Sequence, residues 1–127
     1  MMGPWASVCF ALVTMAATAD TEVSSLSHNQ LTAGRKFDVE TADRLFRVQM
    51  VEPNSGECQM AISSDGESFT APRTVYLLGA TGGRQGNQML VLMREVKVGM
   101  KMELSLGDRE QRHRHITSEV TAIRLAE

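Results

Sequence analysis

Cysteine and aromatic residues are scarce in this sequence. Only Cys9 and Cys58 occur among 127 residues, together with one Trp, one Tyr and four Phe. If the N-terminal residues that hold Cys9 are removed, Cys58 has no partner for an internal disulfide. Apolar burial must then stabilise the fold, and it is adequate for a domain of roughly 100 residues. The sequence therefore argues against a disulfide scaffold and predicts that Cys58 is a small buried hydrophobe, with a disulfide-linked dimer as the alternative.

The chain also lacks a strong excess of either charge. It carries 13 Lys and Arg against 15 Asp and Glu, which gives a formal net charge of −2. A domain that binds nucleic acid normally shows a pronounced basic excess, so no nucleic acid is expected as a partner. Residues 84–127 hold eight basic and six acidic side chains, whereas residues 20–83 hold five and nine. This distribution is consistent with no more than a modestly basic face near the C-terminus.

Charged side chains are absent from residues 1–19. Residues 5–17 form an apolar core, and Ala17-Thr-Ala19 supplies the small-x-small pattern of a cleavage site before Asp20. The core is too short for a membrane helix, which needs roughly 20 residues, and no Lys or Arg precedes it. We predict a signal peptide at 1–19 and a secreted or periplasmic mature protein without a membrane span. The alternatives are a misassigned start codon, a buried apolar strand, or a cytoplasmic or membrane-linked subunit that keeps these residues.

The rest of the chain divides at residue 35. Residues 20–34 are polar and lack a sustained apolar period, so we expect them to form a flexible polar tether. Residues 35–127 mostly show the period of two that is typical of strands, and they are predicted to form one β domain. The clearest run extends from Val96 to Leu106, where six apolar residues alternate with polar residues and glycine. In a strand these six share one face, and Gly99 is expected to mark a bend.

Turn signals separate the alternating runs. Pro53-Asn-Ser-Gly56 lies between a run that contains Phe46, Val48 and Met50 and a second run that begins at Cys58, a pattern that indicates a hairpin. A helix over residues 40–50 is the alternative for the first of these runs. In total, six or seven strands with short polar connections are predicted. The sequence therefore favours an all-β fold, a small antiparallel meander that forms a barrel or a sandwich.

In the stretch from Val75 to Asn87, an apolar run is followed by several glycines. Within it, Gly79-Ala-Thr-Gly82 resembles the opening of atypical short-chain dehydrogenase-like proteins, the NmrA-like group. The resemblance implies a dinucleotide held by the Gly79–Gly86 loop, with a helix N-terminus facing the pyrophosphate. However, the family spacing requires glycine at position 85, which is Gln here, and the following residues lead directly into an alternating strand. We therefore predict a hairpin connection over 79–87 and keep dinucleotide binding as an alternative.

Basic side chains gather in Arg112-His-Arg-His115. The two histidines would share a face of an extended segment, but a zinc site needs at least three protein ligands and the arginines would repel a dication. We therefore predict no metal and no other cofactor. A solvated loop is the default interpretation, and contact with an anionic ligand or an unknown protein partner is the alternative, which would strengthen below about pH 6.5 as the imidazoles become charged. The candidate residues are Arg84, Arg109, Arg112, His113, Arg114 and His115.

Signatures of catalysis are lacking. The sequence has no Gly-x-Ser-x-Gly elbow, and Asp38 and Glu40 flank Val39 as the solvent-facing residues of an ordinary strand would. We predict an exported, non-catalytic binding or assembly module, with its surface in the connections Ser63–Ser68, Gly79–Asn87 and Gly107–His115. The alternative is a small secreted enzyme whose site is assembled from distant residues. Convergence of His, Ser and carboxylate groups in one pocket would favour that alternative.

Overall fold

A computed structural model describes residues 21–85, 88–106 and 114–126. The predicted signal peptide at 1–19 lies outside these residues. The described residues form strands and one short 3-10 turn, which confirms the all-β prediction. No helix in this part of the chain is long and apolar enough to span a membrane. In chain order the elements are β2 (Thr21–Val23), β3 (Ser25–Leu26), η1 (His28–Gln30), β4 (Lys36–Thr41), β5 (Leu45–Glu52), β6 (Glu57–Ser63), β7 (Arg73–Gln85), β8 (Gln88–Met93), β9 (Val96–Lys97), β10 (Lys101–Leu106) and β11 (Arg114–Leu125).

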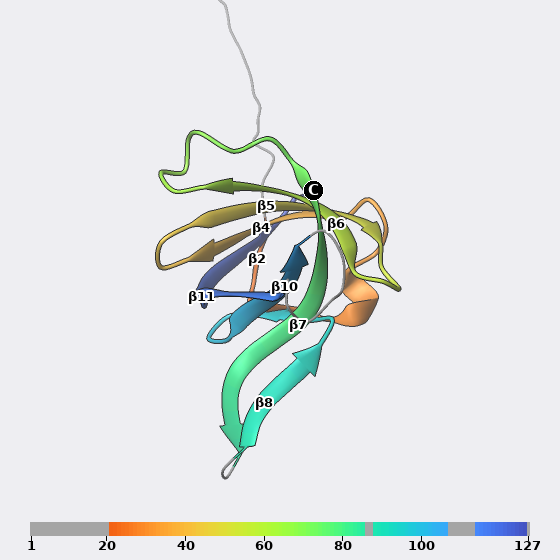
Figure 1. The fold of residues 1–127 in the computed structure, drawn as a ribbon, viewed down its shortest axis with the longest axis vertical. Helices are drawn as coiled ribbons and strands as arrows, with labels where there is room; N and C mark the ends of the chain where they lie inside the picture. Colours follow the sequence, from red (N-terminus) through yellow and green to blue (C-terminus); the bar gives the residue numbers. More distant parts are fainter. Residues whose placement is uncertain (1–20, 86–87, 107–113, 127) are drawn as a thin grey trace, which may run out of the picture.

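Six of the strands form an antiparallel ring (Figure 1). Their order is β10-β11-β4-β5-β6-β7, and the pairing of β10 with β7 connects the last strand to the first. Of the two predicted architectures, the barrel is therefore the one observed. Four of the described strands lie outside the ring, and two of them, β3 and β9, form a separate two-stranded sheet. β8 extends the sheet beside β7, and β2 pairs with the end of β11 beyond its pairing with β10.

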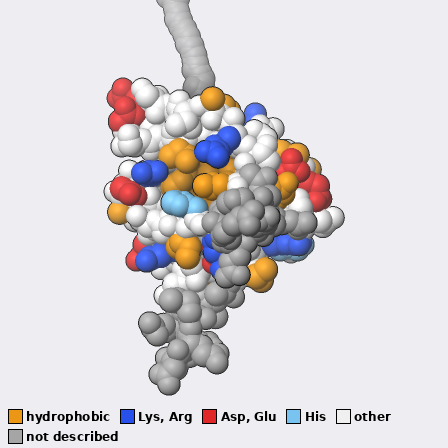
Figure 2. Space-filling view, viewed as in Figure 1, with side chains coloured by type: hydrophobic (Ala, Val, Ile, Leu, Met, Phe, Trp, Pro, Cys, Tyr) orange, Lys and Arg blue, Asp and Glu red, His pale blue; other side chains and the backbone are white. Residues whose placement is uncertain are grey.

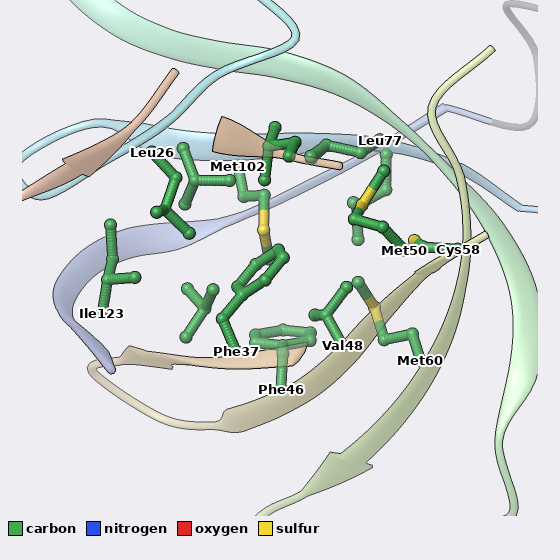
Figure 3. Packing of buried hydrophobic residues seen from close by; sticks show 14 of the residues in the cluster. Leu26, Phe37, Phe46, Val48, Met50, Cys58, Met60, Leu77, Met102 and Ile123 are labelled. Atoms are coloured by element: carbon green, nitrogen blue, oxygen red, sulfur yellow. The ribbon is translucent and has the colours of Figure 1, made fainter. Parts of the chain in front are cut away.

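Apolar side chains alternate into the interior of the ring. Phe46, Val48 and Met50 on β5 are each 2% exposed, which confirms the buried face predicted for that run. Figure 3 shows Phe37 and Phe46 close together, with Met102 reaching toward Phe37 from the opposite side of the core. Because a methionine side chain is flexible and its sulfur packs favourably against aromatic rings, it fills the space between the two sides. The methionines of these strands thus act in packing.

The N-terminal segment differs from the flexible tether predicted for residues 20–34. β2 pairs with β11 and β3 pairs with β9, and the side chains of Leu26 and Leu31 are buried in the core. The intervening η1 turn is capped at Ser27, whose backbone N–H donates to Oε1 of Gln30 at 2.9 Å. Two isolated leucines in a polar stretch produce no periodic signal. Sequence pattern therefore missed a segment that covers part of the core.

The alternating run from Val96 to Leu106 is divided between β9 and β10. Gly99 adopts φ +92° in the turn between them, as the predicted bend requires. The prediction of a common buried face is wrong at two positions, because Val98 and Leu106 are both 36% exposed. Glu103, expected to face solvent, is buried instead. It lies on a strand that is flanked by β11 on one side and by β7 on the other.

The glycine-rich stretch is strand for most of its length, where a connection was predicted. β7 continues to Gln85 and pairs antiparallel with β8, from Gly79 opposite Met93 to Gln85 opposite Gln88. The predicted hairpin is therefore present, but its strands reach much further than expected. Figure 1 shows them projecting from the ring as an arm. A Cβ atom at Gly79 would collide with the carbonyl oxygen of Leu92, so glycine permits the close approach of the two strands.

Candidate functional site

The described members of the predicted cationic set lie in different surroundings. Arg114 and His115 begin β11 and are exposed, whereas Arg84 lies in β7 opposite Met89. Nε of Arg114 is 2.9 Å from Oε2 of Glu103, so a carboxylate already neutralises this guanidinium. The role of the set in anion contact stays a prediction. The remaining three members lie outside the described residues: Arg109, Arg112 and His113.

A hollow of about 180 Å³ beside His115 brings histidine, serine and carboxylate groups together. The hydroxyls of Thr41 and Ser118 donate hydrogen bonds to the Asp43 carboxylate, and these bonds lower its pKa. A catalytic triad needs the carboxylate to orient the histidine and the histidine to hold the nucleophile. Here the carboxylate holds the serine directly, and no hydrogen bond joins the His115 ring to another described residue. The three groups are gathered, but not in the order that activates a nucleophile.

Cys58 is unsuited to nucleophilic chemistry. Burial raises the pKa of its thiol to about 12, and Sγ donates a hydrogen bond to the backbone oxygen of Val75 at 3.4 Å. Because the thiolate is the reactive form, this thiol is inert in the folded protein, and its burial agrees with the prediction. Within the described ranges, no three His, Cys, Asp or Glu side chains gather to hold a metal ion.

A larger groove, of about 560 Å³, crosses the outer face of the ring. It lies over β11, β4, β5 and β6, where the strand register places Arg124, Asp38, Arg47 and Ala61 opposite one another in one row. A second row places Lys36 opposite Gln49 and Gln49 opposite Gln59. These are the positions that alternate with the buried core residues of the same strands. The groove is lined by Lys36, Phe37, Asp38, Arg47, Val48, Gln49, Gln59, Ala61, Pro72, Arg124 and Ala126.

Cations outnumber carboxylates in the lining of this groove. Nε of Arg47 lies 3.3 Å from Oδ1 of Asp38, and Nη2 of Arg124 lies 3.2 Å from Oε1 of Glu40. Both guanidiniums remain accessible, with Arg47 59% and Arg124 40% exposed. No described carboxylate pairs with the ammonium group of Lys36. Because exposed ion pairs contribute only about 0–1 kcal/mol, an incoming carboxylate can compete for these arginines at little cost.

The connection from β6 to β7 borders the groove as a wall, and Pro72 is the residue of this connection that lines it. The Phe69 ring lies under the guanidinium of Arg47, 4.3 Å from Cζ to the ring centroid, which is cation–π geometry. The backbone N–H of Thr70 donates to the carbonyl oxygen of Ile62 at 2.9 Å and holds the wall against β6. On the groove floor, Nε2 of Gln59 donates to Thr74 Oγ1 at 2.9 Å. These contacts fix the position of one guanidinium and the shape of the wall.

Charges of both signs are interspersed over the visible surface. On the face shown in Figure 2, basic and acidic side chains surround a central group of hydrophobic side chains, and neither sign forms a continuous field. Proteins that bind nucleic acid concentrate Lys and Arg on one face. No such concentration is visible on the face in Figure 2, and the expectation that the chain binds no nucleic acid stays a prediction.

The glycine stretch does not have the geometry that a pyrophosphate needs. Dinucleotide binding requires a helix that starts after the glycines and a parallel neighbouring strand. In the described part of the chain, β7 continues past Gly82 and pairs with an antiparallel strand. The helix that the resemblance implies after the glycines is therefore absent from the described residues.

The chain was compared with protein-family models, with curated proteins and with solved structures, and no match was found.

Proposed function

We propose that the protein is an exported, non-catalytic binding module that holds a carboxylate-bearing ligand in the groove over β4, β5, β6 and β11. The observation that carries this proposal is the row of opposed residues that brings Arg47 and Arg124 into one groove, beside Lys36. The volume of about 560 Å³ is typical of small-ligand sites, which span roughly 300–1,000 Å³. Export rests on the composition of residues 1–19, and the non-catalytic assignment on the inert thiol and the order of bonds at Asp43.

The groove suits recognition better than turnover. Arginine offers planar, paired donors that match the two oxygens of a carboxylate. The amide groups of Gln49 and Gln59 add neutral donors and acceptors on the floor of the groove. Among the described residues that line the groove there is no thiol, histidine or hydroxyl group. A ligand that meets these groups would be held and oriented by them.

Calorimetric titration with hexaglutamate tests the ligand class. We expect binding of hexaglutamate and no binding of hexalysine. Arg124→Gln should weaken hexaglutamate binding by about tenfold or more, because a hydrogen bond to a charged group contributes about 1.5–3 kcal/mol. Arg73→Gln is the matched control, because it removes one exposed cation from β7 outside the groove and should change affinity little. Absence of hexaglutamate binding, or equal effects of the two substitutions, would contradict the proposal.

A second function is favoured by the hollow at His115. The gathering of Asp43, His115 and Ser118 is the feature expected of a small hydrolase. The arrangement of these hydrogen bonds supports a hydrolase less well than a binding protein, because Asp43 itself accepts the hydrogen bond of the Ser118 hydroxyl. Labelling by a fluorophosphonate probe that is lost in both Ser118→Ala and His115→Ala would establish the hydrolase. Absence of labelling in the folded protein would exclude the hydrolase function.

A further inference from the structure

The arm formed by β7 and β8 presents an unpaired strand edge. β8 is hydrogen-bonded to β7 and to no other strand among the described residues. β7 has a neighbour on both sides only as far as Thr81, which pairs with Lys101 of β10. Beyond that point the arm has two strands and projects away from the ring (Figure 1). A two-stranded ribbon is marginally stable in water, and its open edge is a template for a further strand.

The base of the arm is fixed to the barrel. Gly79 brings its backbone against the Leu92 carbonyl, where a Cβ atom would not fit. Arg94 ends the arm with φ +52°, a left-handed conformation that is uncommon for a residue other than glycine. Its N–H donates to the carbonyl oxygen of Leu78 at 2.9 Å. These constraints set the direction in which the arm leaves the ring.

The two edges of the arm differ in their protection against pairing. On β7, the segment beyond Thr81 contains Gly82, Gly83 and Arg84, and both glycine and edge charges disfavour strand addition. On β8, Gln88–Met93 reads Gln-Met-Leu-Val-Leu-Met, with no charge, no proline and no glycine. The Met93 side chain is 70% exposed. Exposed edge strands usually carry at least one protective device, so β8 has the composition of a strand that is covered.

We propose that β8 is the docking edge for a second copy of this chain, which adds its own β8 antiparallel across a two-fold axis. In such an interface the same strand faces itself, so a charged strand would place like charges opposite each other and be destabilised. β8 has no ionisable residue and avoids that conflict. In the resulting sheet, the Arg84 positions of the two copies lie on the outermost strands. Three strand spacings separate them by about 14 Å, beyond the screening length of about 8 Å at physiological ionic strength.

Sedimentation equilibrium with charge-swapped variants tests self-pairing. The unmodified protein should dimerise in a concentration-dependent way. Leu90→Glu and Leu90→Lys should each weaken the dimer by about tenfold or more, because each sets like charges across the two-fold axis. An equimolar mixture of the two variants should restore dimerisation, because opposite charges then meet. Only pairing between copies of β8 predicts this recovery.

A matched control distinguishes a specific effect at the β8 edge from a general effect of changing an exposed apolar side chain. Val51 on β5 is 43% exposed, and Val51→Glu or Val51→Lys should leave the dimer unchanged. If the Leu90 variants fail to fold by circular dichroism, the same pair of substitutions at Val91 repeats the design. The proposal is overturned if the unmodified protein is monomeric. It is also overturned if the charged substitutions leave dimerisation unchanged, or if the equimolar mixture of the two variants stays monomeric. The groove lies on other strands, so this proposal and the ligand proposal fail independently.

Discussion

At the scale of single residues, Asp65 shows how one side chain orders a connection. Its Oδ1 accepts hydrogen bonds at 2.9 Å from the backbone N–H groups of Ser68 and Glu67 and from the Ser63 hydroxyl. The bonds from Ser68 and then Glu67 contribute most to lowering its pKa from 3.8 to about 2. The ionised carboxylate therefore holds the turn after β6, the same connection that continues into the wall of the groove.

This interaction predicts a specific pH dependence of stability. Because folding lowers the pKa of Asp65, its contribution is fully present above the unfolded-state value of 3.8 and is lost as the pH falls toward about 2. Asp65→Asn should therefore lower the thermal midpoint at pH 6, and the difference from the unmodified protein should shrink between pH 4 and pH 2. Ser64→Ala, in the same exposed turn, should show no such pH-dependent difference. An Asp65→Asn difference that is constant down to pH 2 would contradict this account.

The groove residues could be predicted singly but not as a site. The alternation in β5 places Arg47 and Gln49 on the solvent face, because Phe46, Val48 and Met50 are the apolar partners. However, Arg124 is remote from Arg47 in sequence, and they share a groove only because β11 pairs with β4 in a particular register. One residue of slip would turn every side chain of a strand to the other face. Register between distant strands is not encoded in local pattern, so the sequence pointed instead to the contiguous cations near His115.

At the scale of elements, the segment β2–β3–η1 covers part of the core. Leu26 on β3 is fully buried, and its strand pairs with Val96 and Lys97 of β9. Leu26→Ala should lower the free energy of unfolding by about 2–5 kcal/mol, the usual cost of removing a large buried side chain. His28→Ala, at an exposed position two residues away, should change it by less than about 0.5 kcal/mol. Chemical denaturation measures both, and equal small effects would restore the tether interpretation.

Periodicity predicted a strand well where one face of the strand packed against the core. It predicted a strand poorly where neighbouring elements covered both of its faces. Near the end of β11 the pairing with β4 shifts register between Val120 and Ala122, which interrupts the period of two there. The pattern was misleading at β10, because ring closure buries Glu103 as well as the apolar face. The pattern also predicted that the strand now labelled β7 ends before the glycines, because glycines normally mark connections. In the arm, Gly79 serves the close approach of two strands within the sheet itself.

At the scale of the whole molecule, the predicted cleavage site lies just before the first described strand, and export stays a prediction. Cleavage between Ala19 and Asp20 would fall just before Thr21, where β2 begins, and would remove none of the described strands. Mass spectrometry of the protein from its native source should therefore identify Asp20 as the first residue. Ala19→Phe should block this processing, because a large side chain violates the small-x-small pattern. A native product that begins at Met1 or Met2 would end the export hypothesis.

The pairing of β2 with β11 has a consequence for engineering the chain. Thr21 is the direct partner of Leu125 across these antiparallel strands, so the beginning and the end of the folded part are about 5 Å apart. A short linker could therefore join them into a continuous ribbon without disturbing the ring. New ends could then be opened at the exposed turn of residues 64–68. Such a circular permutant would keep every strand pair of the barrel while changing the order in which they are synthesised.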